Sequence, residues 1–473
     1  MTVPHERHDV GDGEKRSGAA TLWFLWMLVA VVVALLLRLR TTVDLDLWLH
    51  LRVGRALRDG VFFQQLPDPL VVLADRPYVP TQWLSEVVGS VVEQGLGVTG
   101  IHLLRWLALV VVAAAVHRTA RRWAGPGASV TVTLAVLFGT AAGWGERPQL
   151  LGLALQAVVL LLWSGTLADG RARWALVPVT WLWALCHGSW PIGLGVGGLV
   201  VLALLLSPGR RAVAWRPVVA VLVATAVVPA LTPLGPRLLL EPFAVGTAAR
   251  ATVNEWQSPS PGNPLLVTVV VLAAFVLFRC LRRRPLDLPA VLLALSAVVL
   301  AAWSVRTIAV GALLLTPALA RALAPAVPVA RRRAEVWPAL AAALAVLAVP
   351  GVVLGGPDAG PLPARVDAAV AALPQGARVA VEPRASGWVL WAHPGVVPLR
   401  DLRAEVYTEP TARAYEDFFA ARPGWQRYAD SHDVGALLVR RGEPIDTALA
   451  ADGGWRSAGE ADDWVLWVRG AAR

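Results

Sequence analysis

The sequence predicts a polytopic α-helical membrane protein with about eleven transmembrane helices and a small C-terminal α/β domain. The first observation is composition, since 56% of the 473 residues are hydrophobic and the mean hydropathy is +0.58. The second is that apolar runs long enough to cross about 30 Å of hydrocarbon recur from Thr21 to Pro350. The third is that the chain then turns charged and alternates strand-like with helix-like segments.

These patterns divide the chain into an N-terminal tail over 1–18, a multi-span membrane domain over 19–356 and a C-terminal domain over 361–473. The tail is too polar, and the run after it too long, for a cleaved signal peptide. Membrane spans are predicted near 21–37, 98–116, 128–143, 150–167, 174–190, 192–206, 217–234, 264–278, 288–303, 307–323 and 337–354.

Arginine clusters in every second connection orient the chain. They lie at 118–122, 171–173, 210–216, 279–284 and 331–333. By the positive-inside rule they face the cytoplasm, which gives a multi-pass plasma-membrane protein with a cytoplasmic N-terminus and an extracytoplasmic C-terminal domain. The net charge of +10 is therefore a topology signal. We expect membrane lipid, and no nucleic acid, as a partner.

The connections on the opposite side hold most of the other ionisable side chains. A large first outer loop over 38–97 contains Asp44, Asp46, His50, Trp83 and Glu86. Its segments LWLHLRVGRALRDG and TQWLSEVVGSVVEQ place apolar residues at helical spacing and predict amphipathic helices at the membrane surface. Later connections add Arg147, His187, Glu255, Trp256 and Arg306. This convergence predicts an extracytoplasmic active site.

The C-terminal domain is expected to have a largely parallel sheet. ARVAVE, VVPL, GALLVRR and WVLWVRG are typical of short strands, and ARVDAAVAAL, TARAYEDFFAARPGWQRYA and PIDTALAA are typical of helices between them. The domain has no Gly-rich phosphate fingerprint and no nucleophile elbow, so nothing marks it as catalytic by itself.

These elements resemble the GT-C-type membrane glycosyltransferases, which include protein O-mannosyltransferases and aminoarabinose transferases. More closely, the chain is similar to a largely uncharacterised family of bacterial polytopic membrane proteins with a C-terminal extracytoplasmic domain. The resemblance lies in DLDLWLHLRVG, LPDPL, RPYVPTQWLSEV, RPQLL, WALCHGSW, TPLGPRLL, NEWQSP, VRTIAVGALLLTPALA, GWVLW and RDLRAEVY. This chain has Leu185 and Cys186, and later Thr232, where that family more often has asparagine before His-Gly and before the proline-glycine element.

The resemblance implies a GT-C-like fold and transfer of a sugar from a polyprenyl-phosphate-linked donor to an envelope acceptor, which is a glycan, a lipid or a protein. The acceptor hydroxyl displaces the lipid phosphate at the anomeric carbon with inversion. Such a step needs a carboxylate that takes the hydroxyl proton and cations that hold the leaving phosphate.

With that chemistry, Asp46 is the expected general base, and Asp44 supports it or helps it to bind a divalent metal, Mg²⁺ or Mn²⁺. On a loop or strand-like backbone, residues two apart point the same way, so the two carboxylates could share a proton or a metal ion. Arg147 and Arg306 are expected to bind the donor phosphate, because guanidinium groups bind phosphate bidentately and stay charged. Substrate-binding candidates are His50, Glu86, Trp83, His187, Glu255 and Trp256.

Each assignment has a structural alternative. An Asp-x-Asp pair at a helix end often only caps the helix, and most boundary tryptophans are interface anchors. Arg147 could neutralise Glu146, and His187 could bond a neighbouring helix. Two other functions stay open: a transporter or flippase of a lipid-linked saccharide, and a non-catalytic envelope scaffold. Neither an internal repeat nor midplane charges support the transporter.

Overall fold

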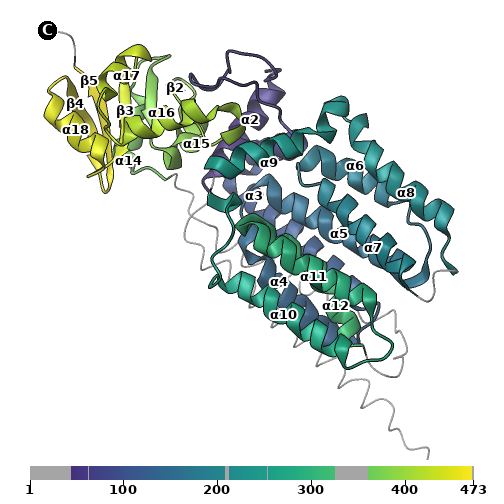
Figure 1. Ribbon diagram of the computed structural model, residues 1–473. Helices are drawn as coiled ribbons and strands as arrows, with labels where there is room; N and C mark the ends of the chain where they lie inside the picture. The colour runs from purple at the N-terminus through teal and green to yellow at the C-terminus, as the bar shows by residue number, and fades with distance from the viewer. Residues whose placement is uncertain (1–43, 62, 208–211, 253, 325–360, 471–473) are drawn as a thin grey trace, which may run out of the picture.

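The computed structural model describes residues 44–61, 63–207, 212–252, 254–324 and 361–470. The predicted N-terminal tail and the predicted spans near 21–37 and 337–354 lie outside the described residues. In the described part, a bundle of α-helices is joined to a smaller α/β domain, and the segment that carries α2 (Asp46–Arg58) lies where the two meet (Figure 1).

The bundle contains α3 (Trp83–Ala120), α4 (Pro126–Thr140), α5 (Pro148–Asp169), α6 (Leu176–Cys186), α7 (Pro191–Leu205), α8 (Trp215–Val227), α9 (Glu241–Thr252), α10 (Pro264–Leu281), α11 (Leu288–Trp303) and α12 (Ile308–Ala322). Within the described residues, five helices are long and apolar enough to cross a membrane. They are α3, α4 with η1 (Ala141–Gly143), α5, α10, and α12 with η6 (Val305–Thr307). The remaining predicted spans of this part are shorter apolar helices, namely α6, α7, α11, and α8 with η3 (Val228–Leu231). The chain is a multi-pass membrane protein, and the count of about eleven spans stays a prediction.

Helix α12 forms the centre of the bundle and is buried along nearly its whole length. Its alanines and Gly311 let neighbouring helices approach closely, as small residues do in membrane helices. A Cβ atom on Gly311 would lie 2.5 Å from the carbonyl oxygen of Ala297 in α11. Because α12 continues directly from η6, this packing fixes the position of Arg306 at the end of the bundle.

Helix α3 joins two segments that the sequence predicts as a surface helix and a separate span. It is kinked at Gly97, which has φ +61°, a value that favours glycine. The part before the kink packs beneath α2, and the part after it continues into the bundle core. The two predicted helices are therefore confirmed as the two segments of α3, which meet at the non-helical Gly97.

The contact between α2 and α3 depends on Gly54. A Cβ atom at this position would lie 2.0 Å from the carbonyl oxygen of Glu86. Only glycine lets the two backbones come this close. The predicted amphipathic helix over 47–60 is thus confirmed, and its small residue faces α3.

We expect Gly54→Ala to destabilise the protein by about 1–3 kcal/mol, since the added methyl group must push α2 away from α3. Gly95→Ala is the matched control, because it lies in α3 with open space around its Cβ position. That change should be neutral or slightly stabilising. Thermal unfolding of both variants in the same lipid nanodiscs tests this, and equal melting temperatures would contradict it.

The C-terminal domain is built on a five-stranded sheet of order β2-β1-β3-β5-β4. The strands are β1 (Arg378–Val381), β2 (Val397–Pro398), β3 (Ala436–Arg440), β4 (Trp455–Ala461) and β5 (Trp464–Arg469). The helices are α14 (Ala364–Ala371), α15 (Pro383–Ala392), α16 (Glu409–Phe419), α17 (Trp425–Ser431) and α18 (Pro444–Asp452). Strands β1, β2 and β3 are parallel to one another, whereas β5 pairs antiparallel with both β3 and β4. The four predicted strands and three predicted helical stretches are confirmed, but the sheet is mixed, and β4 and α15 were not predicted.

The C-terminal domain is held against the bundle through α2 and the loop that follows it. Helix α15 packs on α2, where Trp48 contacts the rings of Trp388 and Trp391 at centroid distances of 4.8 and 4.5 Å. The backbone N–H groups of Val72 and Leu73 donate to carbonyl oxygens beside β2. This loop thereby extends the open edge of the sheet and fixes the domain over the start of α2.

Candidate active site

A cavity of about 1240 Å³ lies between the bundle and the C-terminal domain. Its bundle side is formed by the start of α2, the residues before α5, the α6–α7 connection, η5 (Asn254–Trp256) and η6. Its other side is formed by the residues that follow β1, β2 and β3. Open α/β sheets bind ligands at the carboxyl ends of their parallel strands. The C-terminal domain therefore presents this binding edge to the cavity.

The structure brings most of the predicted site residues to the cavity wall. Those that line it are Asp44, Asp46, His50, Arg147, His187, Glu255, Trp256 and Arg306. Glu86 lines a smaller pocket behind α2. Trp83 begins α3 and lines neither space, so the structure places it apart from the others.

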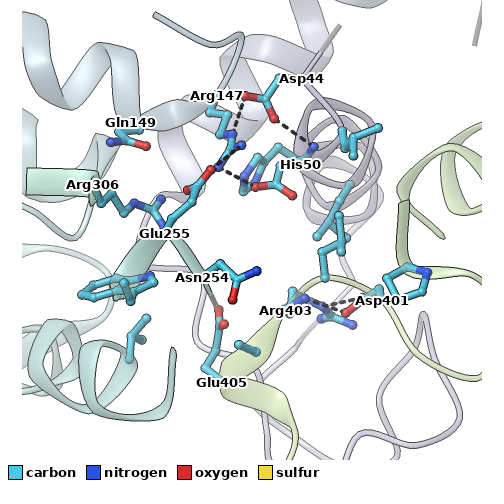
Figure 2. Close-up of a pocket in the computed structure, with 18 of the residues that line it drawn as sticks. Asp44, His50, Arg147, Gln149, Asn254, Glu255, Arg306, Asp401, Arg403 and Glu405 are labelled. Carbon is cyan, nitrogen blue, oxygen red and sulfur yellow. Dashed lines mark hydrogen bonds and ion pairs between the residues drawn. The ribbon is translucent and has the colours of Figure 1, made fainter. Parts of the chain in front are cut away.

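Arg147 is the centre of the carboxylate cluster (Figure 2). Its Nε donates to Oδ2 of Asp44 at 2.5 Å, and its Nη1 lies 3.0 Å from Oδ2 of Asp46. Its two Nη atoms also donate to both oxygens of Glu255, at 3.0 and 3.1 Å. Three guanidinium N–H groups therefore donate to carboxylates, and the contact with Asp46 is an ion pair. Arg147 does not neutralise Glu146, which instead pairs with Arg105 of α3.

The Asp-x-Asp pair does not lie on a strand-like backbone. Asp46 is the first residue of α2, and Asp44 precedes it in a turn. Oδ1 of Asp44 accepts from the backbone N–H of Asp46 at 3.2 Å, so Asp44 also braces the start of the helix. The two carboxylates are brought together by Arg147, and not by the alternation of a strand. Among the described contacts, Oδ1 of Asp46 has no partner, and it is the oxygen left for a ligand.

Arg306 stands on the bundle side of the same cavity. Its guanidinium lies over the Trp256 ring, 5.4 Å from the centroid. Within the described part of the chain, Arg306 makes no ion pair at 4 Å or less, although Glu255 lies nearby in Figure 2. A guanidinium that lines a cavity at the start of a membrane helix is suited to an anionic group of a ligand.

His50 is held from behind by a buried carboxylate. Its Nδ1 lies 2.9 Å from Oε1 of Glu86, whose side chain is fully buried, and Tyr78 donates to the same oxygen at 3.3 Å. This contact fixes the imidazole ring and leaves its other nitrogen for the cavity. His187 bonds within its own turn, with Nδ1 2.7 Å from the Ser189 hydroxyl.

Several residues that line the cavity were not predicted as site residues from the sequence. They are Gln149, Asn254, Glu382, Arg384, Arg400 and Glu405. Burial raises the pKa of Glu405 above its ordinary range, and its side chain points toward Asn254 (Figure 2). The signal that could have found Glu382, Arg384 and Arg400 is their place within three residues after β1 and β2. Glu405 lies further on, in η8 (Ala404–Val406).

A divalent metal at Asp44 and Asp46 does not fit this donor set. Mg²⁺ and Mn²⁺ need several oxygen ligands at metal–oxygen distances of about 2 Å, each with a lone pair free to coordinate the ion. Both oxygens of Asp44 already accept hydrogen bonds, from Arg147 and from the Asp46 backbone. Within the described residues, no group of three or more His, Cys, Asp or Glu side chains converges as metal ligands would. The metal stays a prediction from the sequence that the donor set does not support.

The chain is similar in structure to the oligosaccharyltransferase of Archaeoglobus fulgidus. The apo form has 12% sequence identity and a TM-score of 0.55, with 88% of this chain and 69% of that chain covered. The form tethered to an acceptor peptide with the NVT sequon has 11% identity and a TM-score of 0.58, with 88% and 69% covered. A complex of the same enzyme with Zn and sulfate has 12% identity and a TM-score of 0.53, with 87% and 68% covered.

A second similarity is to the mycobacterial arabinofuranosyltransferase AftD, with 18% identity and a TM-score of 0.51. It covers 94% of this chain but 41% of that larger one. No protein-family model and no curated protein sequence matches the chain. At these identities the likeness concerns the fold, and both similar proteins are membrane glycosyltransferases. The chain therefore has the fold of the GT-C-type membrane glycosyltransferases.

Proposed function

We propose that the chain transfers a sugar from a polyprenyl-phosphate-linked donor to an envelope acceptor, with inversion at the anomeric carbon. The observation that carries this proposal is the cavity, which joins an arginine without an ion pair among the described residues, Arg306, to a carboxylate cluster. The leaving phosphate of a lipid-linked sugar requires a cation, and a hydroxyl nucleophile requires a carboxylate base.

In this proposal, Oδ1 of Asp46 takes the proton of the acceptor hydroxyl. The acceptor oxygen forms a bond to the anomeric carbon, and the bond from that carbon to the phosphate oxygen breaks. Arg306 stabilises the charge on the leaving phosphate. Asp44 and Arg147 hold Asp46 in place, and the charge of Arg147 is already balanced by three carboxylates. The binding of the donor phosphate that the sequence predicts for Arg147 is therefore proposed to be secondary to that of Arg306.

The remaining predicted residues are proposed to position the substrates. Trp256, under Arg306, offers an apolar face to the sugar, and His187 and Glu255 offer polar atoms on the same wall. His50 and Glu86 set the shape of the wall next to Asp46, one helical turn away. Trp83 would act only by supporting α3 from outside the cavity.

The distribution of arginines supports an extracytoplasmic site. Helix α5 begins at the cavity after Arg147 and ends next to Arg171 and Arg173. Likewise, η6 and α12 together lead from Arg306 to Arg321. Arg171, Arg173 and Arg321 thus lie at the far ends of helices that start at the cavity. By the positive-inside rule, those far ends face the cytoplasm, and the cavity faces outward.

The acceptor is proposed to enter from the side of the C-terminal domain. Arg384 and Arg400 follow parallel strands there, beside Glu382, Glu416 and the Phe419 ring. Charged groups interleaved with an aromatic ring suit a polyhydroxylated chain, which favours a glycan among the acceptor classes.

The experiment that tests the function is a comparison of host envelopes with and without the protein, by mass spectrometry of lipid-linked sugars and envelope glycans. Loss of one sugar from one glycoconjugate, together with accumulation of its polyprenyl-phosphate donor, is the expected result. Unchanged glycans and donors in the deletion strain would refute the transferase proposal.

We expect Arg306→Met to weaken donor use by about ten- to a hundredfold, because a hydrogen bond to a charged group contributes about 1.5–3 kcal/mol. The loss should appear as a lower kcat/KM for the lipid-linked donor, because Arg306 acts on the leaving phosphate, with the acceptor KM unchanged. Arg237→Met is the control, since Arg237 is exposed and pairs with Glu241 outside the cavity. Equal kcat/KM for the donor in the two variants would argue against a phosphate contact.

A further inference from the structure

We infer that Arg147 is an internal cation that occupies the position between Asp44 and Asp46 where a divalent metal would bind, so that the carboxylate pair works without one. The inference rests on the proposed function, because it concerns how the general base is held. Whether Arg147 or a metal ion binds the two aspartates can nevertheless be measured without sugar transfer. One of the similar structures was solved with Zn and sulfate. Whether a metal binds at Asp44 and Asp46 must therefore be decided from the residues of this chain.

The contacts of Arg147 carry the inference. One guanidinium reaches three carboxylates from two segments of the chain: Asp44 and Asp46 at 2.5 and 3.0 Å, and Glu255 through two hydrogen bonds. Arg147 contacts Oδ2 of both aspartates. A metal at this point must first displace the guanidinium, and with it the attachment to Glu255.

Arg147 is also built into the wall more firmly than a surface side chain. It is the residue before α5, with an extended backbone, and Pro148 begins the helix. Its side chain is 20% exposed, and that of Asp44 only 9%. Burial lowers the pKa of Arg147, but Asp46, Asp44 and Glu255 raise it by more, so the net direction is upward. The cation is therefore permanent at any pH the protein meets.

The arrangement has a chemical advantage for the proposed step. The guanidinium holds one oxygen of Asp46 in an ion pair at 3.0 Å and leaves Oδ1 without a described partner. A divalent ion bound to the same carboxylate would withdraw more charge from it and weaken it as a base. Arg147 thus holds the base in place while it remains able to take a proton.

The test is Mn²⁺ binding, measured by electron paramagnetic resonance on the full-length protein in nanodiscs after treatment with EDTA. The wild-type protein should show no saturable site up to about 1 mM, the weak end of divalent-cation sites on extracellular modules. Sugar transfer, where it is followed, should be unchanged by EDTA. A saturable Mn²⁺ site that Asp44→Asn abolishes, or activity that EDTA removes and Mn²⁺ restores, would overturn the inference.

Arg147→Ala supplies the positive control, since it leaves the three carboxylates without their cation. It should gain a Mn²⁺ site that is lost again when Asp44→Asn is added. Arg173→Ala, at the other end of α5 and paired with Asp169, should gain none. If Arg147→Ala does not fold, the wild-type measurement decides alone. Because metal binding is read without a substrate, failure of this inference is distinguishable from failure of the proposed transfer.

Discussion

Asp46→Asn should reduce sugar transfer by about a hundred- to ten-thousandfold, the range that a positioned general base contributes. The amide keeps the size of the side chain and can still accept from Arg147 through its oxygen. It cannot take the hydroxyl proton. The rate should therefore fall while the KM for donor and acceptor changes little. Transfer measured in nanodiscs with purified lipid-linked donor separates the two parameters.

Asp59→Asn is the matched control. Asp59 caps the other end of α2, is exposed, and does not line the cavity. The same chemical change there should leave transfer and stability unaltered. If Asp46→Asn is correctly inserted and transfers sugar at the wild-type rate, Asp46 is not the base. The transporter and scaffold alternatives would then deserve the next experiments.

The sequence predicted the chemistry of the cavity wall better than its geometry. The spacing of Asp44 and Asp46 predicts a loop or strand-like backbone, whereas Asp46 begins a helix and only Asp44 lies outside it. That helix is stabilised by burial of its apolar side chains against α3 and α15. Such support comes from segments far away in the sequence, and local spacing does not reveal it.

The ion-pair partners of adjacent residues could not be predicted from the sequence either. The structural alternative in which Arg147 neutralises Glu146 is wrong, because Glu146 binds Arg105 and Arg147 binds Asp44. Arg147 has an extended backbone, in which neighbouring side chains point in opposite directions. One therefore faces the bundle and the other the cavity, a choice that depends on the helices packed on each side.

In the C-terminal domain, burial explains which strands could be predicted. Strands β1, β3 and β5 are mostly buried and read as apolar runs. Strand β4 lies at the edge and is largely exposed, so its sequence WRSAGEA shows no apolar alternation. Its neighbour β5 supplies the pairing that makes it a strand. This missing edge strand is also why a largely parallel sheet was expected and a mixed one is found.

The largest effect on stability is expected from Arg403→Met, in the contact that fixes the C-terminal domain over the cavity. Arg403 donates to both oxygens of Asp68 at 2.9 and 3.0 Å and to Asp401 at 2.7 Å. All three side chains are at most 3% exposed. Burial lowers the pKa of Arg403, but Asp401 and Asp68 raise it well above its ordinary value. The group is thus charged, paired and dehydrated.

Removal of Arg403 leaves two buried carboxylates without a cation, which costs about 3–5 kcal/mol. Arg413→Met is the control, because its pair with Glu409 is exposed on both sides and contributes about 0–1 kcal/mol. Thermal unfolding and limited proteolysis in nanodiscs should both separate the two variants. Adding Asp68→Asn and Asp401→Asn to Arg403→Met should recover part of the loss, since the uncompensated charges disappear. If Arg403→Met melts like Arg413→Met, this contact does not hold the domain, and the acceptor side of the cavity must be fixed by the packing of α15 on α2 instead.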